Sequence, residues 1–171
     1  MNELSLERVN ANAPYEVVRR EGRYVHLFFC NDYGVDYEIS FRPDDSIVTS
    51  GAFALDITRR TQKESPGDPK FRLTLVAIIE EFFWQNNDVM LYLTETGDGR
   101  QAMRNMLFIQ WFNTYEHRDR YVIRAAEGRM EGQLNFMALF SRTDNPRLQQ
   151  ALDEFEETVS LLFDPPVGSQ V

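Results

Sequence analysis

The sequence has little cysteine, histidine or lysine, and it has no long apolar run. Cys30 is the single cysteine among 171 residues, which excludes a disulfide within the chain and is typical of a reducing compartment. His26 and Cys30 lie four residues apart on an expected strand, roughly 13 Å along its axis, so one zinc ion cannot bridge them. We therefore expect no metal site and no cofactor. No apolar stretch approaches the roughly 20 residues of a membrane helix.

Positive charge is scarce, and almost all of it is arginine. The formal net charge is −9, and Lys63 and Lys70 are the only lysines. An acidic balance opposes binding to nucleic acid and to anionic lipid. The opening residues 1–8 have neither the basic nor the apolar region of a signal peptide. We expect a cytoplasmic protein that binds neither membranes nor nucleic acid, although arginines do gather in one stretch: Arg100, Arg104, Arg118, Arg120, Arg124 and Arg129.

The hydrophobic periodicity predicts seven strands and three helices. Alternating or β-rich apolar segments predict strands near 15–20, 24–30, 34–42, 52–61, 89–94, 120–126 and 134–140. Apolar residues at helical spacing predict helices near 69–85, 100–117 and 145–164. Asp68 and Pro69 are the residue types that begin a helix.

Short turns between the first four strands favour an antiparallel meander. The order of elements predicts an α+β fold, with about three helices packed on one face of a mainly antiparallel sheet. We expect a single domain over residues 14–164, with flexible or loosely ordered ends at 1–13 and 165–171. The 24–30 strand is apolar on both faces and is therefore expected to be central or covered twice.

The turn Gly97-Asp98-Gly99-Arg100 is the strongest candidate for a ligand site. Backbone N–H groups at the start of a helix suit a phosphate or carboxylate, helped by Arg100 and Arg104 one helical turn apart. The alternative is that Asp98 caps the helix while Gly97 and Gly99 allow unusual backbone angles. The pattern lacks the Gly-Lys-Ser/Thr ending of a phosphate-binding P-loop. We favour the cap.

The helix after this turn is apolar over more than one face. Such a helix is either sandwiched in the core or partly given to a partner surface. We favour the core, but Trp111 and Tyr115 would anchor a protein interface if that face is exposed. Among the many carboxylates, Asp36 and Glu38 alternate with apolar residues and are expected on a solvated strand face.

Four segments together resemble an uncharacterised family of small bacterial proteins, catalogued only as a domain of unknown function. They are the 37–41 strand, Ile79-Glu80-Glu81-Phe82-Phe83, the Gly97-Asp98-Gly99-Arg100-Gln101 turn and helix, and Asp144-Asn145-Pro146. The resemblance covers most of the chain from Tyr15. It implies a bacterial cytosolic single domain, and it implies no catalytic activity.

Two functions remain open at this point. The favoured one is a non-catalytic interaction module, as a homo-oligomer or as one member of a two-protein bacterial system. The alternative is an enzyme that binds a small molecule or nucleotide at an anion site formed by 97–104. No nucleophile–base pair is evident in the sequence, which favours the first.

The two interpretations of Asp98 predict different stabilities. If Asp98 is a helix cap, Asp98→Ala should lower the free energy of unfolding by about 0.5–2 kcal/mol, whereas Asp98→Asn should be nearly neutral. If the turn is a ligand site, removing Asp98 should leave stability unchanged or raise it. Denaturant melts of both variants decide between them, and a stabilised Asp98→Ala protein would overturn the cap.

Overall fold

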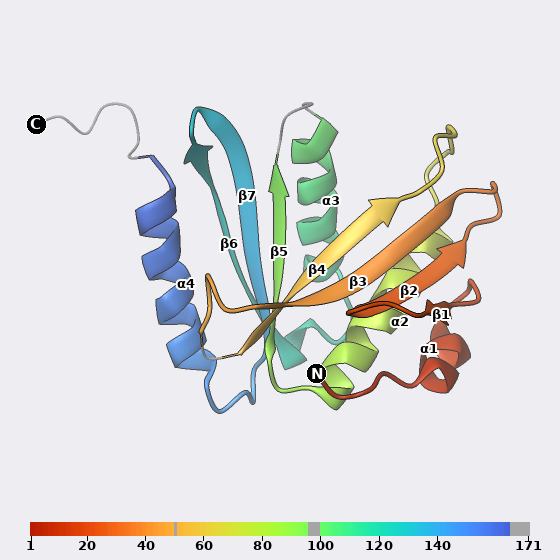
Figure 1. Ribbon diagram of the computed structural model, residues 1–171, viewed down its shortest axis with the longest axis horizontal. Coiled ribbons are helices and arrows are strands. Elements are labelled where there is room, and N and C mark those ends of the chain that lie inside the picture. The colour runs from red at the N-terminus through yellow and green to blue at the C-terminus, as the bar shows by residue number, and fades with distance from the viewer. Residues whose placement is uncertain (50, 96–99, 165–171) are drawn as a thin grey trace, which may run out of the picture. The chain divides into compact units, whose positions relative to one another are not determined.

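The computed structural model describes residues 1–49, 51–95 and 100–164, of which 95 and 100–105 are described by their backbone alone. In chain order the elements are α1 (Leu6–Asn12), β1 (Val18–Arg20), β2 (Val25–Cys30), β3 (Asp36–Asp44), β4 (Ala52–Arg59), α2 (Pro69–Gln85), β5 (Val89–Glu95), α3 (Arg100–Asn113), the 3₁₀ turn η1 (Arg118–Arg120), β6 (Tyr121–Met130), β7 (Gln133–Arg142) and α4 (Leu148–Leu162) (Figure 1). The strands form a seven-stranded mixed sheet, and the α+β class is confirmed. The chain divides into two compact units, which are described separately below.

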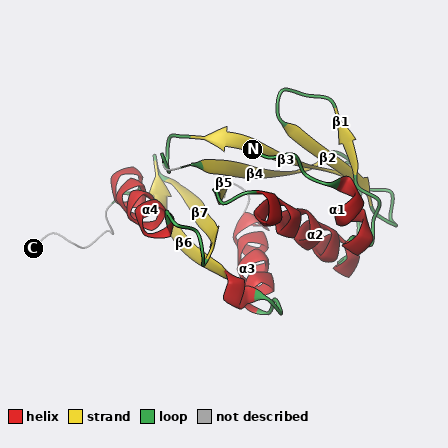
Figure 2. Ribbon diagram, turned by 90° about the horizontal axis from the view of Figure 1, so that it is seen from below, coloured by secondary structure: helices red, strands yellow, loops and turns green. Residues whose placement is uncertain are grey.

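The first unit comprises Met1–Pro43 and Ala54–Asp88. Its strands follow one another in the order β1-β2-β3-β4, and β2 pairs antiparallel with both β1 and β3. In this register Phe28 of β2 lies opposite Val18 on one side and Glu38 on the other. Helices α1 and α2 lie on the same side of these strands (Figure 2). The expectation that residues 24–30 form a central strand holds, but in the described part of this unit helices cover one of its two faces.

Aromatic packing attaches α2 to the strands of the first unit. The rings of Phe41 on β3 and Phe82 on α2 stack with centroids 4.8 Å apart, and both side chains are fully buried. Asp68 begins α2 as predicted, because its carboxylate accepts hydrogen bonds from the backbone N–H groups of Lys70 and Phe71. Pro69 is then the first helical residue.

Helix α1 brings the number of α-helices among the described residues to four, one more than the sequence predicted. Ser5 caps it by accepting a hydrogen bond from the Arg8 N–H. The buried Glu81 carboxylate of α2 then accepts bonds from the Ser5 N–H at 2.7 Å and from the Arg8 side chain at 2.9 Å. Burial acts to raise the pKa of Glu81, but these hydrogen bonds outweigh it and lower the pKa. Seven residues rarely form a stable helix alone, so this long-range anchor explains why local sequence did not reveal α1.

Strand β1 is shorter than the predicted 15–20. The Asn10 side chain of α1 accepts a hydrogen bond from the Val17 N–H at 2.7 Å and donates one to the Val17 carbonyl at 2.9 Å. The backbone groups of Val17 are therefore already paired before β1 begins at Val18.

The second unit comprises Asp44–Phe53 and Val89–Val171. Its strands lie in the order β5-β7-β6, with antiparallel pairs. Helix α3 packs on one face, where Phe108 stacks on Tyr92 of β5 with centroids 4.9 Å apart and meets Phe140 of β7. Helix α4 packs on the other face, where Phe155 joins a buried cluster with Leu91 and other apolar residues.

The expectation of helices on one face is therefore wrong for the second unit. Strand β7 is buried over nearly its whole length because both of its faces meet a helix. Its continuous apolar run is typical of a strand covered on both sides.

The β6–β7 hairpin is tighter than the gap between the predicted strands 120–126 and 134–140. Met130 pairs with Gln133, so only Glu131 and Gly132 form the loop. Both have positive φ, 53° for Glu131 and 80° for Gly132, which is the geometry of a two-residue type I′ turn. Each strand therefore continues to the turn.

Stability should depend strongly on Phe82 and weakly on its neighbour Trp84. Phe82→Ala should lower the free energy of unfolding by about 3–5 kcal/mol, because it empties a packed core position. Trp84→Ala is the matched control on the same helix, since 71% of this side chain is exposed, and it should cost less than about 1 kcal/mol. Urea melts measure both, and equal losses would contradict the packing described here.

Candidate functional site

The predicted anion site lies largely beyond what the structure describes. Gly97, Asp98 and Gly99 are outside the described residues, and Arg100 and Arg104 are described only by the helical backbone of α3. The choice between a helix cap and a ligand site at this turn stays a prediction.

The two predicted interface residues lie at the end of α3 and just after it. Trp111 and Tyr115 are both half-buried. The Tyr115 ring contacts His117 and Tyr121, and its hydroxyl is buried without a hydrogen-bond partner among the described residues. The aromatic face of α3 thus contributes Phe108 to the core, and the proposed interface role of Trp111 and Tyr115 stays a prediction.

A different candidate site lies in the first unit, on the side of β1–β3 opposite the helices. Side chains alternate across a strand, so the residues between the core positions point to this side. We call this surface the open face, and it is formed by Val18, Arg20, His26, Phe28, Cys30, Asp36 and Glu38. Arg60, just after β4, reaches the same surface through its contact with Glu38.

Glu38 is the buried centre of the open face. Only 6% of the residue is exposed, although the sequence predicted a solvated position. His26 Nδ1 lies 2.6 Å from one carboxylate oxygen, and the Arg60 guanidinium donates two bonds to the other. A buried carboxylate is costly unless it is paired and hydrogen-bonded, and here strand β2 and the residue just after β4 supply the partners.

These partners keep Glu38 ionised. Burial acts to raise the pKa of its carboxyl, but the hydrogen bonds from His26 and Arg60, together with their charges, lower the pKa below its ordinary value. Arg60 is therefore held in place by a fixed negative charge. The His26 ring is held through its Nδ1 atom by the same carboxylate.

The His26 ring also requires a glycine beside it. A Cβ at position 22 would lie 2.7 Å from the His26 Cδ2 atom, closer than real Cβ contacts allow. Gly22, in the turn between β1 and β2, thus leaves room for the ring to stay on Glu38.

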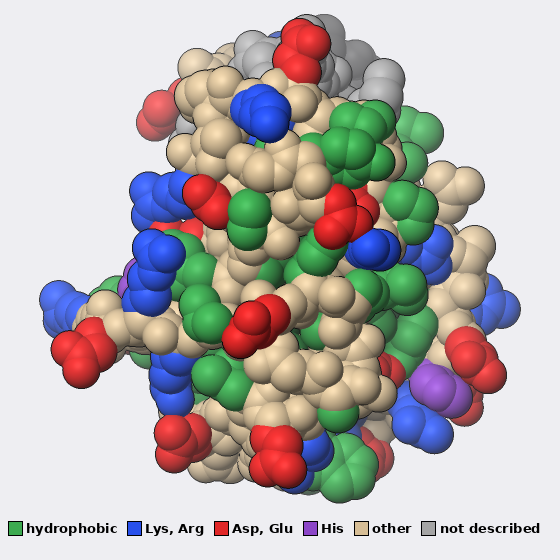
Figure 3. Space-filling model, turned by 90° about the vertical axis from the view of Figure 1, so that its right-hand side faces the viewer, with side chains coloured by type: hydrophobic (Ala, Val, Ile, Leu, Met, Phe, Trp, Pro, Cys, Tyr) green, Lys and Arg blue, Asp and Glu red, His purple; other side chains and the backbone are tan. Residues whose placement is uncertain are grey.

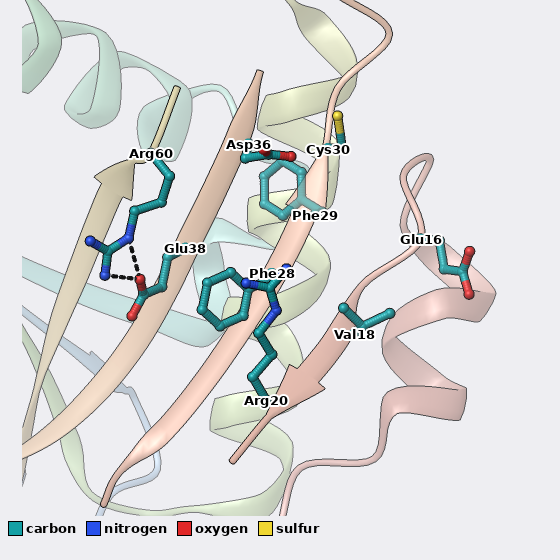
Figure 4. A pocket seen from close by; sticks show the side chains of 9 residues that line it. All are labelled: Glu16, Val18, Arg20, Phe28, Phe29, Cys30, Asp36, Glu38 and Arg60. Atoms are coloured by element: carbon teal, nitrogen blue, oxygen red, sulfur yellow. Dashed lines mark hydrogen bonds and ion pairs between the residues drawn. The ribbon is translucent and has the colours of Figure 1, made fainter. Parts of the chain in front are cut away.

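Next to Glu38 the open face is hollowed by about 540 Å³, a volume typical of ligand pockets. Its lining comprises Glu16, Val18, Arg20, Phe28, Phe29, Cys30, Asp36, Glu38 and Arg60 (Figure 4). The Arg20 guanidinium lies over the Phe28 ring, 4.1 Å from its centroid. Arg20 forms no ion pair within the described parts of the chain.

Cys30 and Asp36 lie opposite each other at one end of the hollow (Figure 4). Desolvation, then the hydrogen bond and charge of Asp36, raises the pKa of the Cys30 thiol. The thiol therefore stays neutral near pH 7, and a neutral thiol is a poor nucleophile. No cluster of three or more His, Cys, Asp or Glu side chains that could hold a metal ion occurs among the residues described.

One side of the molecular surface shows no dominant charge that would indicate the kind of ligand. On the side of the molecule drawn in Figure 3, acidic and basic side chains are interspersed, and neither sign forms a continuous patch on the described surface. No helix in the described ranges is long and apolar enough to cross a membrane. Local chemistry in the hollow therefore carries more information than net charge.

The described residues thus define an α+β protein with a hollow on an open sheet face. Residues 67–157 match the model of a family of unknown function, DUF6169, and since this is more than half of the chain, the chain belongs to that family. The residues that line the hollow, between Glu16 and Arg60, precede the matched segment. No curated protein and no solved structure matches the chain significantly.

The lowered pKa of Glu38 predicts a pH-dependent contribution to stability. Because the folded pKa lies below the unfolded value, the carboxylate stabilises the fold above about pH 4–5, and this is lost as pH falls through the folded pKa. Glu38→Gln should lower the free energy of unfolding by about 1–3 kcal/mol at pH 7. The difference from wild type should shrink toward pH 3.

Urea melts at pH 7, 5, 4 and 3 measure this difference. Glu3→Gln is the control, because Glu3 also pairs with an arginine but its side chain is 84% exposed, and it should change little at any pH. A Glu38→Gln difference that stays constant from pH 7 to pH 3 would contradict the assignment.

Proposed function

We propose that this chain is a binding module rather than an enzyme, and that it holds its ligand in the hollow of the open face. The observation that carries the proposal is the fixed arrangement around Glu38. His26 and Arg60 are both immobilised on this buried carboxylate, while the neighbouring Arg20 is stacked on Phe28. Because these side chains are already ordered, less side-chain conformational entropy is lost when a ligand binds.

Arg20 supplies the donors for a ligand. A guanidinium presents five N–H groups in a planar fork that suits a carboxylate or phosphate. The Phe28 ring occupies one face of the guanidinium, so the N–H edges remain for hydrogen bonding. An anionic group is the natural partner for this side chain.

The lining residues favour binding over catalysis. Cys30 is held as a neutral thiol by its surroundings, and His26 already shares one ring nitrogen with Glu38. The two lie four residues apart on β2, roughly 13 Å along the strand, so His26 cannot activate the thiol.

We propose that the ligand belongs to a second copy of this chain or to another protein in a two-protein bacterial system, as the sequence led us to expect. A net charge of −9 favours a partner that carries basic groups. The alternative, an enzyme with an anion site at Gly97–Arg104, rests on the sequence pattern alone.

Substitution of Arg20 tests the proposal. Amide chemical shifts should be recorded while a panel of small carboxylates, phosphates and amines is added to the protein. A ligand of the hollow should perturb the amides of β1–β3, and Arg20→Ala should weaken its binding roughly tenfold or more, through the loss of a charge-assisted bond.

Arg19→Ala is the matched control for this experiment. Arg19 neighbours Arg20 on β1, but it pairs with Glu3 and lies opposite the buried Leu27 rather than on the open face. It should leave binding unchanged. Equal effects of the two substitutions, or no compound that perturbs β1–β3, would contradict the proposal.

A further inference from the structure

We infer that the hollow takes a zwitterionic ligand, with a carboxylate at one end and a cationic group at the other, joined by a short apolar chain. This inference rests on the proposed function and names the chemistry of the ligand. It comes from the order in which β1, β2 and β3 place their side chains across the open face.

The strand register arranges the open face in three rows. The first row holds Arg20 opposite His26, and the second holds Val18, Phe28 and Glu38. The third row holds Cys30 opposite Asp36. Successive rows lie two residues apart along the strands, or roughly 7 Å.

Charge changes sign from the middle of the hollow to its third-row end. The Arg20 side chain begins in the first row and extends over Phe28 in the second, so its guanidinium lies near the middle of the hollow (Figure 4). Asp36 stands in the third row. Glu16 lines the same hollow, two residues before Val18, and it forms no ion pair within the described ranges.

Asp36 has acceptor capacity to spare. Its carboxylate accepts a bond from the Thr61 hydroxyl at 3.3 Å and one from the Cys30 thiol, but a carboxylate offers about four acceptor positions. In contrast, Glu38 is occupied by His26 and Arg60. A cationic group in the hollow therefore has Asp36 as its partner, while a carboxylate has Arg20.

Beside the guanidinium the hollow is also lined by apolar carbon. Phe28 presents its ring and Val18, 43% exposed, presents its side chain. A few methylene groups lying on these two residues would remove apolar surface from water. The guanidinium, the apolar side chains beside it and the acid one row further along match the carboxylate, methylenes and ammonium group of such a ligand.

This chemistry occurs both in a free amino acid with a terminal amine and in a lysine residue at the carboxyl end of a protein. Both carry a carboxylate and an ammonium group separated by methylenes. The experiment below includes one arm for each source.

The direct probe is 6-aminohexanoate, compared with hexanoate, which lacks the amine, and hexylamine, which lacks the carboxylate. Titrations followed by amide shifts of β1–β3 should give 6-aminohexanoate an affinity roughly tenfold above either control, as expected when each removes one charge-assisted contact. Arg20→Met should abolish the preference over hexylamine. Asp36→Asn should reduce the preference over hexanoate, and Arg19→Met should change neither.

Free L-lysine and the tripeptide Gly-Gly-Lys then separate the two sources. Tighter binding of the tripeptide assigns the hollow to a protein carboxyl terminus, and tighter binding of lysine assigns it to a free amino acid. The C-terminal amide of the tripeptide should lose binding in either case, because it removes the carboxylate.

Equal affinity for hexanoate and 6-aminohexanoate would contradict the inference of a zwitterionic ligand, but it would still support a hollow that binds anions. Shifts in β1–β3 with other compounds of the panel, but none with 6-aminohexanoate, would do the same. Circular dichroism melts of Arg20→Met and Asp36→Asn confirm that each variant is folded before its affinity is compared.

Discussion

The alternation of side chains along β2 and β3 is the constraint on which the first unit depends. Once Phe41 stacks on Phe82 of α2, every second residue of β3 must point toward the helix, and the residues between them must point away. A slip of one residue would exchange the two sets completely. One strand register therefore determines both which side chains pack in the core and which side chains form the open face.

The burial of Glu38 is an energetic cost of this register, and the ordered polar surface around it is a consequence of the same register. The register places a carboxylate where neighbouring side chains remove it from water, and an unpaired charge there would be strongly destabilising. His26 and Arg60 compensate it, and in doing so they lose their own freedom of movement. The result is a polar surface that is already ordered before any ligand arrives, beside an arginine that has kept its hydrogen-bonding capacity.

Local patterns in the sequence predicted the elements whose causes are local. The cap at Asp68 and the helix that follows it were predicted to within the observed bounds, because a cap needs only neighbouring residues. Helix α1 was not among the predicted helices, because the segment before Pro14 indicated one helical turn at most and the helix is anchored by Glu81 on another helix. The continuous apolar run of β7 did contain the signal for helices on both faces, but it was interpreted as an ordinary strand.

The candidate site could not be predicted from local sequence either, because it too depends on residues that are distant in the chain. Both partners of Glu38 are distant in the chain, with His26 on β2 and Arg60 beyond β4, so the sequence shows only an acidic residue on a strand that alternates. Two signals were nevertheless present. A histidine stood on an apolar strand, and Arg20 and Phe28 both fell on strands whose alternation could be followed.

The two hydrogen bonds between Asn10 and Val17 have a consequence for how the protein meets other chains. Strand β1 is the last in the strand order, and an edge strand exposes main-chain groups to which a foreign strand can add. The Asn10 amide reproduces the pairing that such a strand would offer, with one donor and one acceptor. Strand addition at Val17 would therefore first require the loss of these two hydrogen bonds, so α1 limits how far a foreign strand can extend along this edge before β1 begins.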